Sequence, residues 1–230
     1  MHLFGIIYIL VDIIYNKTMK NQSRSSYTIT PDKFFDREQR RKLIKTAKEK
    51  AELDLLHGRR SWPVRYMLVD LALYSGLRVA EIAALKLGDL ELLTQDPRLT
   101  ICNGKGNKKR AVYLDKDLVR HLKDFIRLKK ASCGESVEND APLFSGRGGN
   151  HCQPITLMKS FKVAVKAAGL PNRFSIHSAR HTYATFLLHD TKNMKYVQRQ
   201  LGHSSIGMTA LYAEIMPEEN SVLANKIVRD

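Results

Sequence analysis

The apolar residues of this chain recur mostly at intervals of three and four, the spacing that places them on one face of an α-helix. The first such stretch, residues 36–57, carries an apolar stripe at Leu43, Ile44, Ala47, Ala51 and Leu55. Residues 64–74 are apolar on nearly every side, which predicts a central buried helix that Pro63 begins and Gly76 ends. Further helices are predicted at residues 79–87, 115–132, 156–168, 177–189, 194–201, 206–213 and 217–230.

The spacing changes to every second position in two short stretches, residues 99–102 and 111–114, which predicts β-strands. The segment between them is rich in glycine, asparagine and basic residues, so we expect a β-hairpin with a basic loop. A second loop is expected at residues 133–154, which are rich in glycine, proline and asparagine. We therefore predict a mainly α-helical fold with one small antiparallel β-sheet.

The start of the chain differs from the rest. Residues 3–14 are apolar apart from Gly5 and Asp12, but this run is too short to span a bilayer and lacks the features of a signal peptide. It either packs on the main body or has little role in the fold. Residues 16–31 are polar and typical of a linker. We therefore divide the chain into an N-terminal segment with its linker, residues 1–30, and one main domain, residues 31–230.

The charge balance indicates a polyanionic partner. Lysine and arginine number 38 against 23 acidic residues, which gives a net charge of +15. Nucleic acid, an anionic membrane surface and a merely solvated basic surface all fit this balance. The three cysteines, Cys102, Cys133 and Cys152, are odd in number and form no CxxC pair, which indicates free thiols in a reducing cytoplasm.

The helix predicted at residues 177–189 would carry His177, Arg180 and His181 on one face, because residues three and four apart are neighbours. A cation and two imidazoles on an otherwise apolar helix are costly to bury without a partner, and a phosphate would be such a partner. Zinc is the alternative, since His177 and His181 have the spacing of zinc ligands. No glutamate lies between them, however, and Arg180 would repel the ion.

Three further motifs contain residues of related chemistry. LGHSS contains His203 and precedes Tyr212, which by itself would be an ordinary core or surface tyrosine. SGLRVAEI contains Arg78 and Glu81, which form either a plain ion pair or a pair that aims the arginine at phosphate oxygens. The hairpin loop contains Lys105 and lacks the spacing of an ATP-binding P-loop.

Taken together and in order, SGLRVAEI, GKGNKKR, HSARHTYAT, LGHSS and a tyrosine nine residues after its histidine resemble the tyrosine recombinases, or phage integrase family. The resemblance covers residues 31–217. Each motif alone is a weak signal, but five in this order at compatible spacing are specific. The resemblance implies that residues 31–230 form a catalytic domain that cleaves and rejoins DNA strands in integration, inversion or resolution.

The resemblance also implies a role for each matched residue. Tyr212 would attack the scissile phosphate and form a 3′-phosphotyrosyl bond. Arg78 and Arg180 would hold the nonbridging oxygens, where fixed cations stabilise the charge that develops in the transition state. Lys105 would protonate the leaving 5′-oxygen.

The remaining matched residues would complete the pocket. His177 and His203 would belong to it, with His177 the better candidate to accept the tyrosine proton, and Glu81 would be a supporting residue. His181 and Thr185 also match family positions and are expected to be structural.

The expected partner is double-stranded DNA, whose phosphates Lys108, Lys109 and Arg110 would contact without reading sequence. No cofactor is expected. Two arginines and a lysine would supply the positive charge that a metal ion would otherwise provide, and the phosphotyrosyl bond would retain the energy of the phosphodiester, so rejoining would need no ATP. The resemblance further implies a dimer or tetramer on DNA and an accessory DNA-bending protein. The helix at residues 217–230 would dock either on a neighbouring protomer or on its own core. No membrane partner is expected, and the chain is expected to be cytoplasmic.

Typical members of the family carry a helical DNA-clamping domain before the catalytic domain, and residues 1–30 do not resemble it. The chain would then be a short one-domain invertase, a remnant of an integrase, or a domain that keeps the stub of a longer ancestor. Two other functions use the same residues: a type IB topoisomerase-like relaxing activity, and DNA binding without catalysis.

Overall fold

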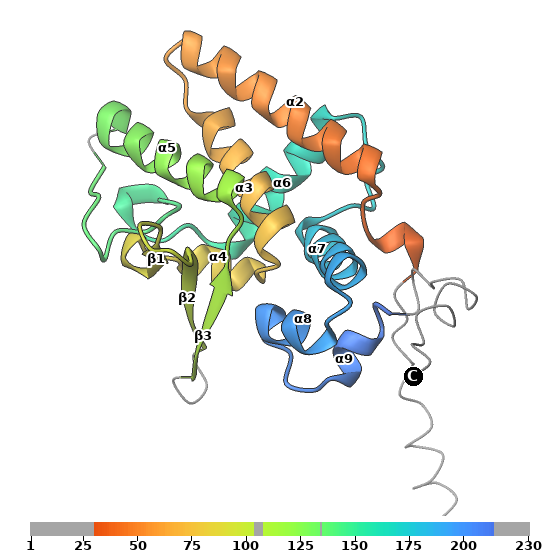
Figure 1. Ribbon diagram of the computed structural model, residues 1–230. Helices are drawn as coiled ribbons and strands as arrows, with labels where there is room; N and C mark the ends of the chain where they lie inside the picture. The colour runs from red at the N-terminus through yellow and green to blue at the C-terminus, as the bar shows by residue number, and fades with distance from the viewer. Residues whose placement is uncertain (1–29, 104–107, 134, 214–230) are drawn as a thin grey trace, which may run out of the picture.

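The computed structural model describes residues 30–103, 108–133 and 135–213, which form helices around one small sheet (Figure 1). The helices are α2 (Arg37–Leu56), α3 (Ser61–Ser75), α4 (Val79–Ala84), α5 (Lys116–Cys133), α6 (Pro154–Ala167), α7 (Ile176–Thr191), α8 (Met194–Leu201) and α9 (Gly207–Ala210). Single turns of 3-10 helix occur at η1 (Pro31–Lys33), η2 (Leu87–Asp89) and η3 (Arg147–Gly149). The antiparallel sheet has the order β1 (Leu90–Glu91), β2 (Arg98–Asn103) and β3 (Lys108–Tyr113). This architecture confirms the predicted fold class.

The sheet contains one strand more than the pattern predicted. β1 has only two residues, which is too short to show an alternation, and it pairs Leu90 with Leu99 of β2. The predicted hairpin is formed by β2 and β3, whose register places Thr100 opposite Ala111. Residues 104–107, which include Lys105, lie outside the described part of the chain.

Two helices are shorter than predicted. α4 ends at Ala84 rather than Leu87, because the backbone of Leu85 is extended at φ −60° and ψ 131°. α9 covers only part of residues 206–213, because the backbone N–H groups of Tyr212 and Ala213 bond to carbonyls three residues back and so form turns. The helix predicted at residues 217–230 lies outside the described residues.

The main core surrounds α3, as predicted. The α3 residues Met67, Leu68 and Leu71 are fully buried, and α2, α5, α6 and α7 all pack against this helix. Phe35, which precedes α2, stacks on Phe174 with ring centroids 4.3 Å apart. Burial of such side chains stabilises the fold by about 1.5–3 kcal/mol each.

A smaller apolar cluster joins α7, α8 and the turn after α9. Its buried members are Phe34, Ala184, Leu188, Val197, Leu201 and Tyr212. In Figure 1, α8 and α9 lie below α7, on the same side of the molecule as the β2–β3 hairpin, and α8 contacts β3. The smaller cluster therefore holds Tyr212 beside the elements that carry the other predicted site residues.

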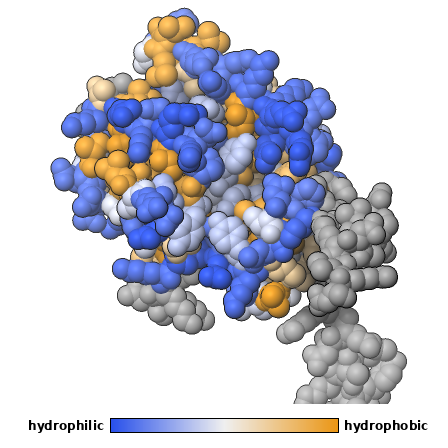
Figure 2. Space-filling model, viewed as in Figure 1, coloured by the Kyte–Doolittle hydropathy of each residue, from blue (hydrophilic) through white to orange (hydrophobic). Residues whose placement is uncertain are grey.

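The surface is mainly hydrophilic on the face that Figure 2 shows, with apolar groups at the top, over the end of α2. There Leu53, Leu55 and Leu56 are exposed. Cys102 and Cys152 are free thiols, as predicted. Among the described residues, no helix is both long enough and apolar enough to cross a membrane.

Gly76 at the end of α3 offers a test of the packing. Its φ is +63°, and an added Cβ would lie 2.3 Å from Cδ1 of Tyr183 and 2.9 Å from Cδ2 of Leu201. We expect Gly76→Ala to lower the free energy of unfolding by about 2–4 kcal/mol, from left-handed strain plus overpacking. Gly58 is the matched control, because its φ is +65° and nothing lies within 4 Å of an added Cβ. Gly58→Ala should cost only about 1–2 kcal/mol in urea unfolding, and equal losses would contradict the close packing at Gly76.

Candidate active site

Arg180 of α7 is buried, with 6% of its surface exposed. Its two terminal nitrogens donate to the backbone carbonyls of Gly76 and Leu201, the latter at 2.9 Å, which lie at the C-terminal ends of α3 and α8. Helix C-termini carry partial negative charge, so they are suitable acceptors for a buried cation. Each terminal nitrogen has a second N–H, and in the described part of the chain these hydrogens have no bonded acceptor. Burial is the main cause that lowers the pKa of Arg180 to about 10, which still leaves it charged at neutral pH.

Glu81 of α4 binds two arginines at once. Its Oε2 accepts from the backbone N–H of Arg78 at 2.8 Å, and its Oε1 accepts from the Arg78 guanidinium at 3.1 Å. Both terminal nitrogens of Arg110 donate to the same carboxylate, at 2.7 and 2.9 Å. Burial is the strongest influence on the pKa of Glu81 and raises it, but the bonds from Arg110 and Arg78 together outweigh burial and lower the pKa. Glu81 therefore stays ionised and holds Arg78 in one orientation.

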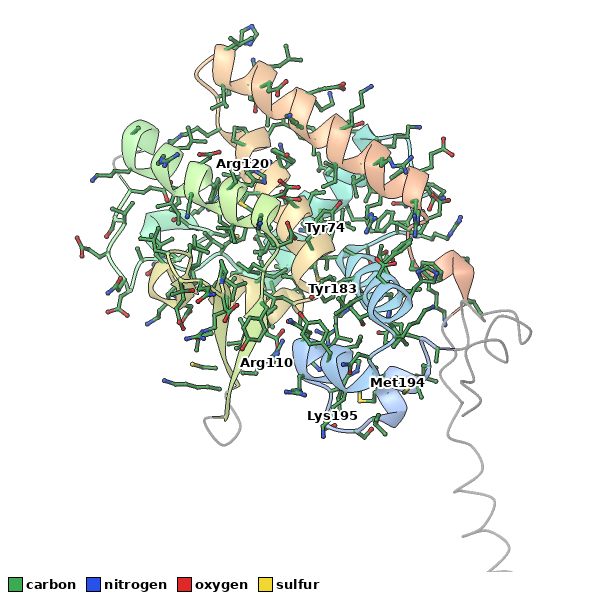
Figure 3. All side chains as sticks on the ribbon, in the orientation of Figure 1. Tyr74, Arg110, Arg120, Tyr183, Met194 and Lys195 are labelled. Carbon is green, nitrogen blue, oxygen red and sulfur yellow. The ribbon has the colours of Figure 1, made fainter. Side chains whose placement is uncertain are left out.

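Arg110 connects the hairpin to the helical part of the site (Figure 3). Its side chain is only 11% exposed and also donates from Nε to the carbonyl of Gln200 on α8, at 3.4 Å. A Cβ on Gly202 would lie 2.8 Å from the Arg110 side chain, so this glycine permits the close approach. A phosphate contact by Arg110 stays a prediction. The structure directs its guanidinium toward Glu81.

Tyr212 lies in the apolar cluster with 4% of its surface exposed. Its hydroxyl is 3.0 Å from Nδ1 of His181, one turn of α7 beyond His177. The ring of His203 is parallel to the Tyr212 ring within 10°, and its Nδ1 is 3.0 Å from Oγ1 of Thr209. The phenol of Tyr212 is therefore oriented by one imidazole and packed beside another.

Both of these imidazoles are neutral at pH 7. The pKa of His181 is lowered to about 4, first by burial and then by the charges of His177 and Arg180. The pKa of His203 is also lowered to about 4, first by burial and then by Arg180 and Arg78. A neutral imidazole nitrogen can accept a hydrogen bond from a phenol, which an imidazolium cannot do.

The structure brings together six of the ten predicted site residues: Arg78, Glu81, Arg110, Arg180, His203 and Tyr212. His177 is exposed on the first turn of α7, and its predicted role in proton transfer stays a prediction. Lys105 and the side chain of Lys108 are outside the described residues, and Lys109 is exposed. Thr185 is buried, and its hydroxyl has no hydrogen-bond partner among the residues described.

Two positions have contacts that we did not predict, and both left a signal in the sequence. Arg110 lies two residues before Val112, so alternation along β3 places its side chain on the buried face. His181 precedes Ala184 and Leu188 by three and seven residues, which places it on the same apolar stripe. We expected His181 to be structural, and it is its ring that meets the Tyr212 hydroxyl.

The sequence profile of the phage integrase family matches residues 33–219. This match covers most of the chain, and the fold agrees with it. The chain belongs to the phage integrase family, the tyrosine recombinases.

Individual proteins are similar to this chain in sequence or in fold. A curated tyrosine recombinase of Pseudothermotoga lettingae is 32% identical over 165 residues, which is 72% of this chain and 54% of that protein. The crystal structure of XerA recombinase has a TM-score of 0.64 and 25% identity, over 84% of this chain and 62% of that one. The XerH recombinase in a post-cleavage complex with its palindromic difH substrate has a TM-score of 0.67 and 24% identity, over 84% and 52%. This chain spans about half the length of the curated relatives it matches.

The ion pair between Arg110 and Glu81 predicts a positioning effect. Arg110→Gln would leave the half-buried Glu81 with Arg78 alone, so the Arg78 guanidinium would turn further toward the carboxylate and away from a bound phosphate. We expect cleavage of a DNA substrate to slow by about 10- to 100-fold, less than the loss of a direct transition-state contact. Arg120→Gln on α5, where the side chain is 72% exposed, is the control and should cleave at the normal rate. Equal rates for Arg110→Gln and the parent chain would contradict the positioning role.

The two neutral histidines predict a loss of stability in mild acid. Both have a pKa near 4 when folded, and a histidine in the unfolded chain has its ordinary value of 6.5. The unfolded chain therefore binds protons first, so the stabilisation is complete above about pH 6.5 and is lost as the pH falls towards 4. Urea midpoints measured at pH 7, 6 and 5 should fall steadily for the parent chain.

The double variant His181→Asn/His203→Asn should show a shallower fall with pH, even if it is less stable throughout. His57→Asn, at an exposed position after α2, should keep the slope of the parent chain. Parallel slopes for all three proteins would show that these imidazoles do not control the pH dependence.

Proposed function

We propose that this chain is the catalytic domain of a site-specific DNA recombinase that cleaves and rejoins strands through a 3′-phosphotyrosyl bond to Tyr212. The observation that carries the proposal is the Tyr212 hydroxyl, which is 3.0 Å from His181 in a cluster that also contains buried Arg180. A phenol held beside fixed cations is the arrangement that nucleophilic attack on a phosphodiester requires. Membership of the phage integrase family supports the same reaction.

In the proposed step, the Tyr212 oxygen bonds to phosphorus while the bond from phosphorus to the 5′-oxygen breaks. His181, with a pKa of about 4, is too weak a base to hold the phenol proton, so it orients the hydroxyl. We assign acceptance of the proton to His177, and the leaving oxygen takes a proton from Lys105. Rejoining reverses these transfers, with a 5′-hydroxyl as the attacking group.

Arg180 and Arg78 are held by different groups, but we assign both the same role of binding the phosphoryl oxygens. Arg180 is held by helix-end carbonyls, and Arg78 is held by Glu81. Because both cations are positioned before the substrate arrives, they need little reorganisation as negative charge develops on the phosphoryl oxygens. This charge stabilisation, and the energy kept in the phosphotyrosyl bond, let the reaction proceed without a metal ion or ATP.

We further propose that two or more copies act together on double-stranded DNA. XerH, which shares the fold, was crystallised with a palindromic substrate, and a palindrome presents the same half-site twice to a two-fold symmetric protein. Tyr212 is only 4% exposed, so contact of its hydroxyl with a phosphate would require the turn after α9 to shift when DNA binds. An accessory DNA-bending protein and docking of residues 217–230 on a neighbouring protomer stay predictions.

Covalent trapping tests the nucleophile. The full chain would be incubated with nicked suicide duplexes drawn from the DNA that flanks its gene, and denaturant-resistant adducts would be measured. The parent chain should form an adduct and Tyr212→Phe should form none, because only the hydroxyl is removed. Tyr113→Phe is the matched control, at a tyrosine that is 44% exposed at the end of β3, and it should react normally.

The alternative functions give different results in the same assay. An adduct that persists in Tyr212→Phe would contradict the assigned nucleophile. DNA binding without any adduct would indicate DNA binding without catalysis. Relaxation of supercoiled plasmids that lack a particular site would indicate a topoisomerase-like activity instead of site-specific recombination.

A further inference from the structure

A second concentration of positive charge lies at the end of α3 that is remote from Arg180. Arg180 contacts Gly76 just after α3, whereas this second region surrounds Ser61 at its start. The 15 residues of α3 separate the two regions by about 22 Å at 1.5 Å per residue. Here the start of α3, the second half of α5 and residues 143–145 enclose a cavity of about 560 Å³. That volume is in the usual range for a small-molecule site.

The cavity contains more positive than negative charge. Four cations line it, namely Arg59, Arg60, Arg65 and Lys129. Two carboxylates oppose them: Glu135, which also lines the cavity and accepts from Lys129 at 2.6 Å, and Asp54, which accepts from Arg59 at 2.8 Å. The described lining and its direct partners therefore have a surplus of two positive charges.

Arg60 and Arg65 are the cations with the weakest compensation. Arg60 is 3.9 Å from Glu135, which is too long for a hydrogen bond. The Nε of Arg65 is buried and has no hydrogen-bond partner among the described residues. The Arg65 guanidinium instead lies 5.1 Å from the ring centroid of Trp62. A buried guanidinium N–H without an acceptor is uncommon in native proteins, so Arg65 lacks the compensation that an anion in the cavity would supply.

Lys129 places a fixed charge in the same wall. Its side chain is 5% exposed and donates to Ser145 at 2.9 Å as well as to Glu135. A buried ammonium with two bonded partners cannot swing away as a surface lysine does. Lys129 therefore holds Glu135 and offsets its negative charge, so that Arg60 is left without a hydrogen-bonded carboxylate among the described residues.

The rest of the lining combines five apolar side chains with three serines. The apolar wall is formed by Val64, Phe125, Leu128, Leu143 and Phe144, and the serines are Ser61, Ser145 and Ser160. Phe125 and Phe144 lie with ring centroids 6.0 Å apart, and Val64 is 37% exposed. A ligand that fits both walls has a doubly charged anionic head and a flat, weakly polar body.

We propose that this cavity, which we call the α3 pocket, binds a small phosphate monoester. A phosphate monoester carries a charge of about −1.5 to −2 at pH 7, which matches the surplus in the pocket. Arg60 and Arg65 hold the phosphate, Lys129 offsets the charge of Glu135, and the organic part lies on the apolar wall. The α3 pocket is separate from the residues that hold DNA in the proposed function. We favour a small molecule over a DNA backbone, because the cations line a cavity that has an apolar wall.

Calorimetry on the full chain tests the proposal, with adenosine 5′-monophosphate as the probe. Adenosine and inorganic phosphate serve as its two halves. The monophosphate should bind at sub-millimolar concentration and each half at least about tenfold more weakly, because each contacts one wall only. Arg65→Gln should weaken binding of the monophosphate by about tenfold or more, since it removes charge-assisted hydrogen bonds. Arg127→Gln on α5, where the side chain is 77% exposed, is the control and should bind normally.

Circular dichroism would establish that each variant is folded. Arg60→Gln, at a position 47% exposed, provides a second test if Arg65→Gln does not fold. Failure of the monophosphate to bind at millimolar concentration would overturn the proposal, as would equal binding of adenosine. Unchanged binding in both Arg65→Gln and Arg60→Gln would place the probe elsewhere, such as between Arg78 and Arg180. An equal loss of affinity for a short DNA duplex would assign the α3 pocket to the DNA surface and overturn the small-molecule proposal.

Discussion

A guanidinium that is buried in a protein must have hydrogen-bond acceptors, because the free-energy cost of burying a cation without them is large. In this chain the constraint falls on Arg180, whose acceptors are the carbonyls of Gly76 and Leu201. Those two atoms belong to helices that are distant in sequence, so α3, α7 and α8 must meet at one point. Among the described residues, the second hydrogens of the same nitrogens have no bonded acceptor, which leaves them available to an anion. The burial of one side chain therefore determines both the packing of three helices and the position of the candidate site.

A second ionic group connects the hairpin to this arrangement. Glu81 binds Arg78 on one side and Arg110 on the other, so the strand that follows the basic loop is tied to the helix that follows Arg78. Burial is the main cause that keeps His181 and His203 neutral, and the positive charges add to it, because an imidazolium would be repelled by Arg180 as well as desolvated. The same cations that suit a phosphate therefore also help to keep the tyrosine's neighbours in the form that accepts a hydrogen bond.

Local patterns predicted much of the fold because a helix or hairpin depends on neighbours in sequence. The central helix, the two main strands and the extent of α2 follow from apolar spacing. The sequence pattern did not predict β1, because two residues are too few to show an alternation. The helix predicted at residues 206–213 was too long, because Tyr212 is held in a turn by its packing. Contacts such as His181 with Tyr212, 31 residues apart, depend on how helices pack, which local spacing does not encode.

By itself the sequence determined the class of fold, the family and the residue types able to hold a phosphate, because motifs in a set order carry that information. It also showed an excess of positive charge. Only the tertiary structure decided how this charge is distributed. It assigned Arg110 to Glu81, placed Arg180 at two helix ends, and gathered Arg60, Arg65 and Lys129 around the α3 pocket. The physical reason is that the energy of a charge depends on its burial and on its partners in space, and both are properties of the folded chain.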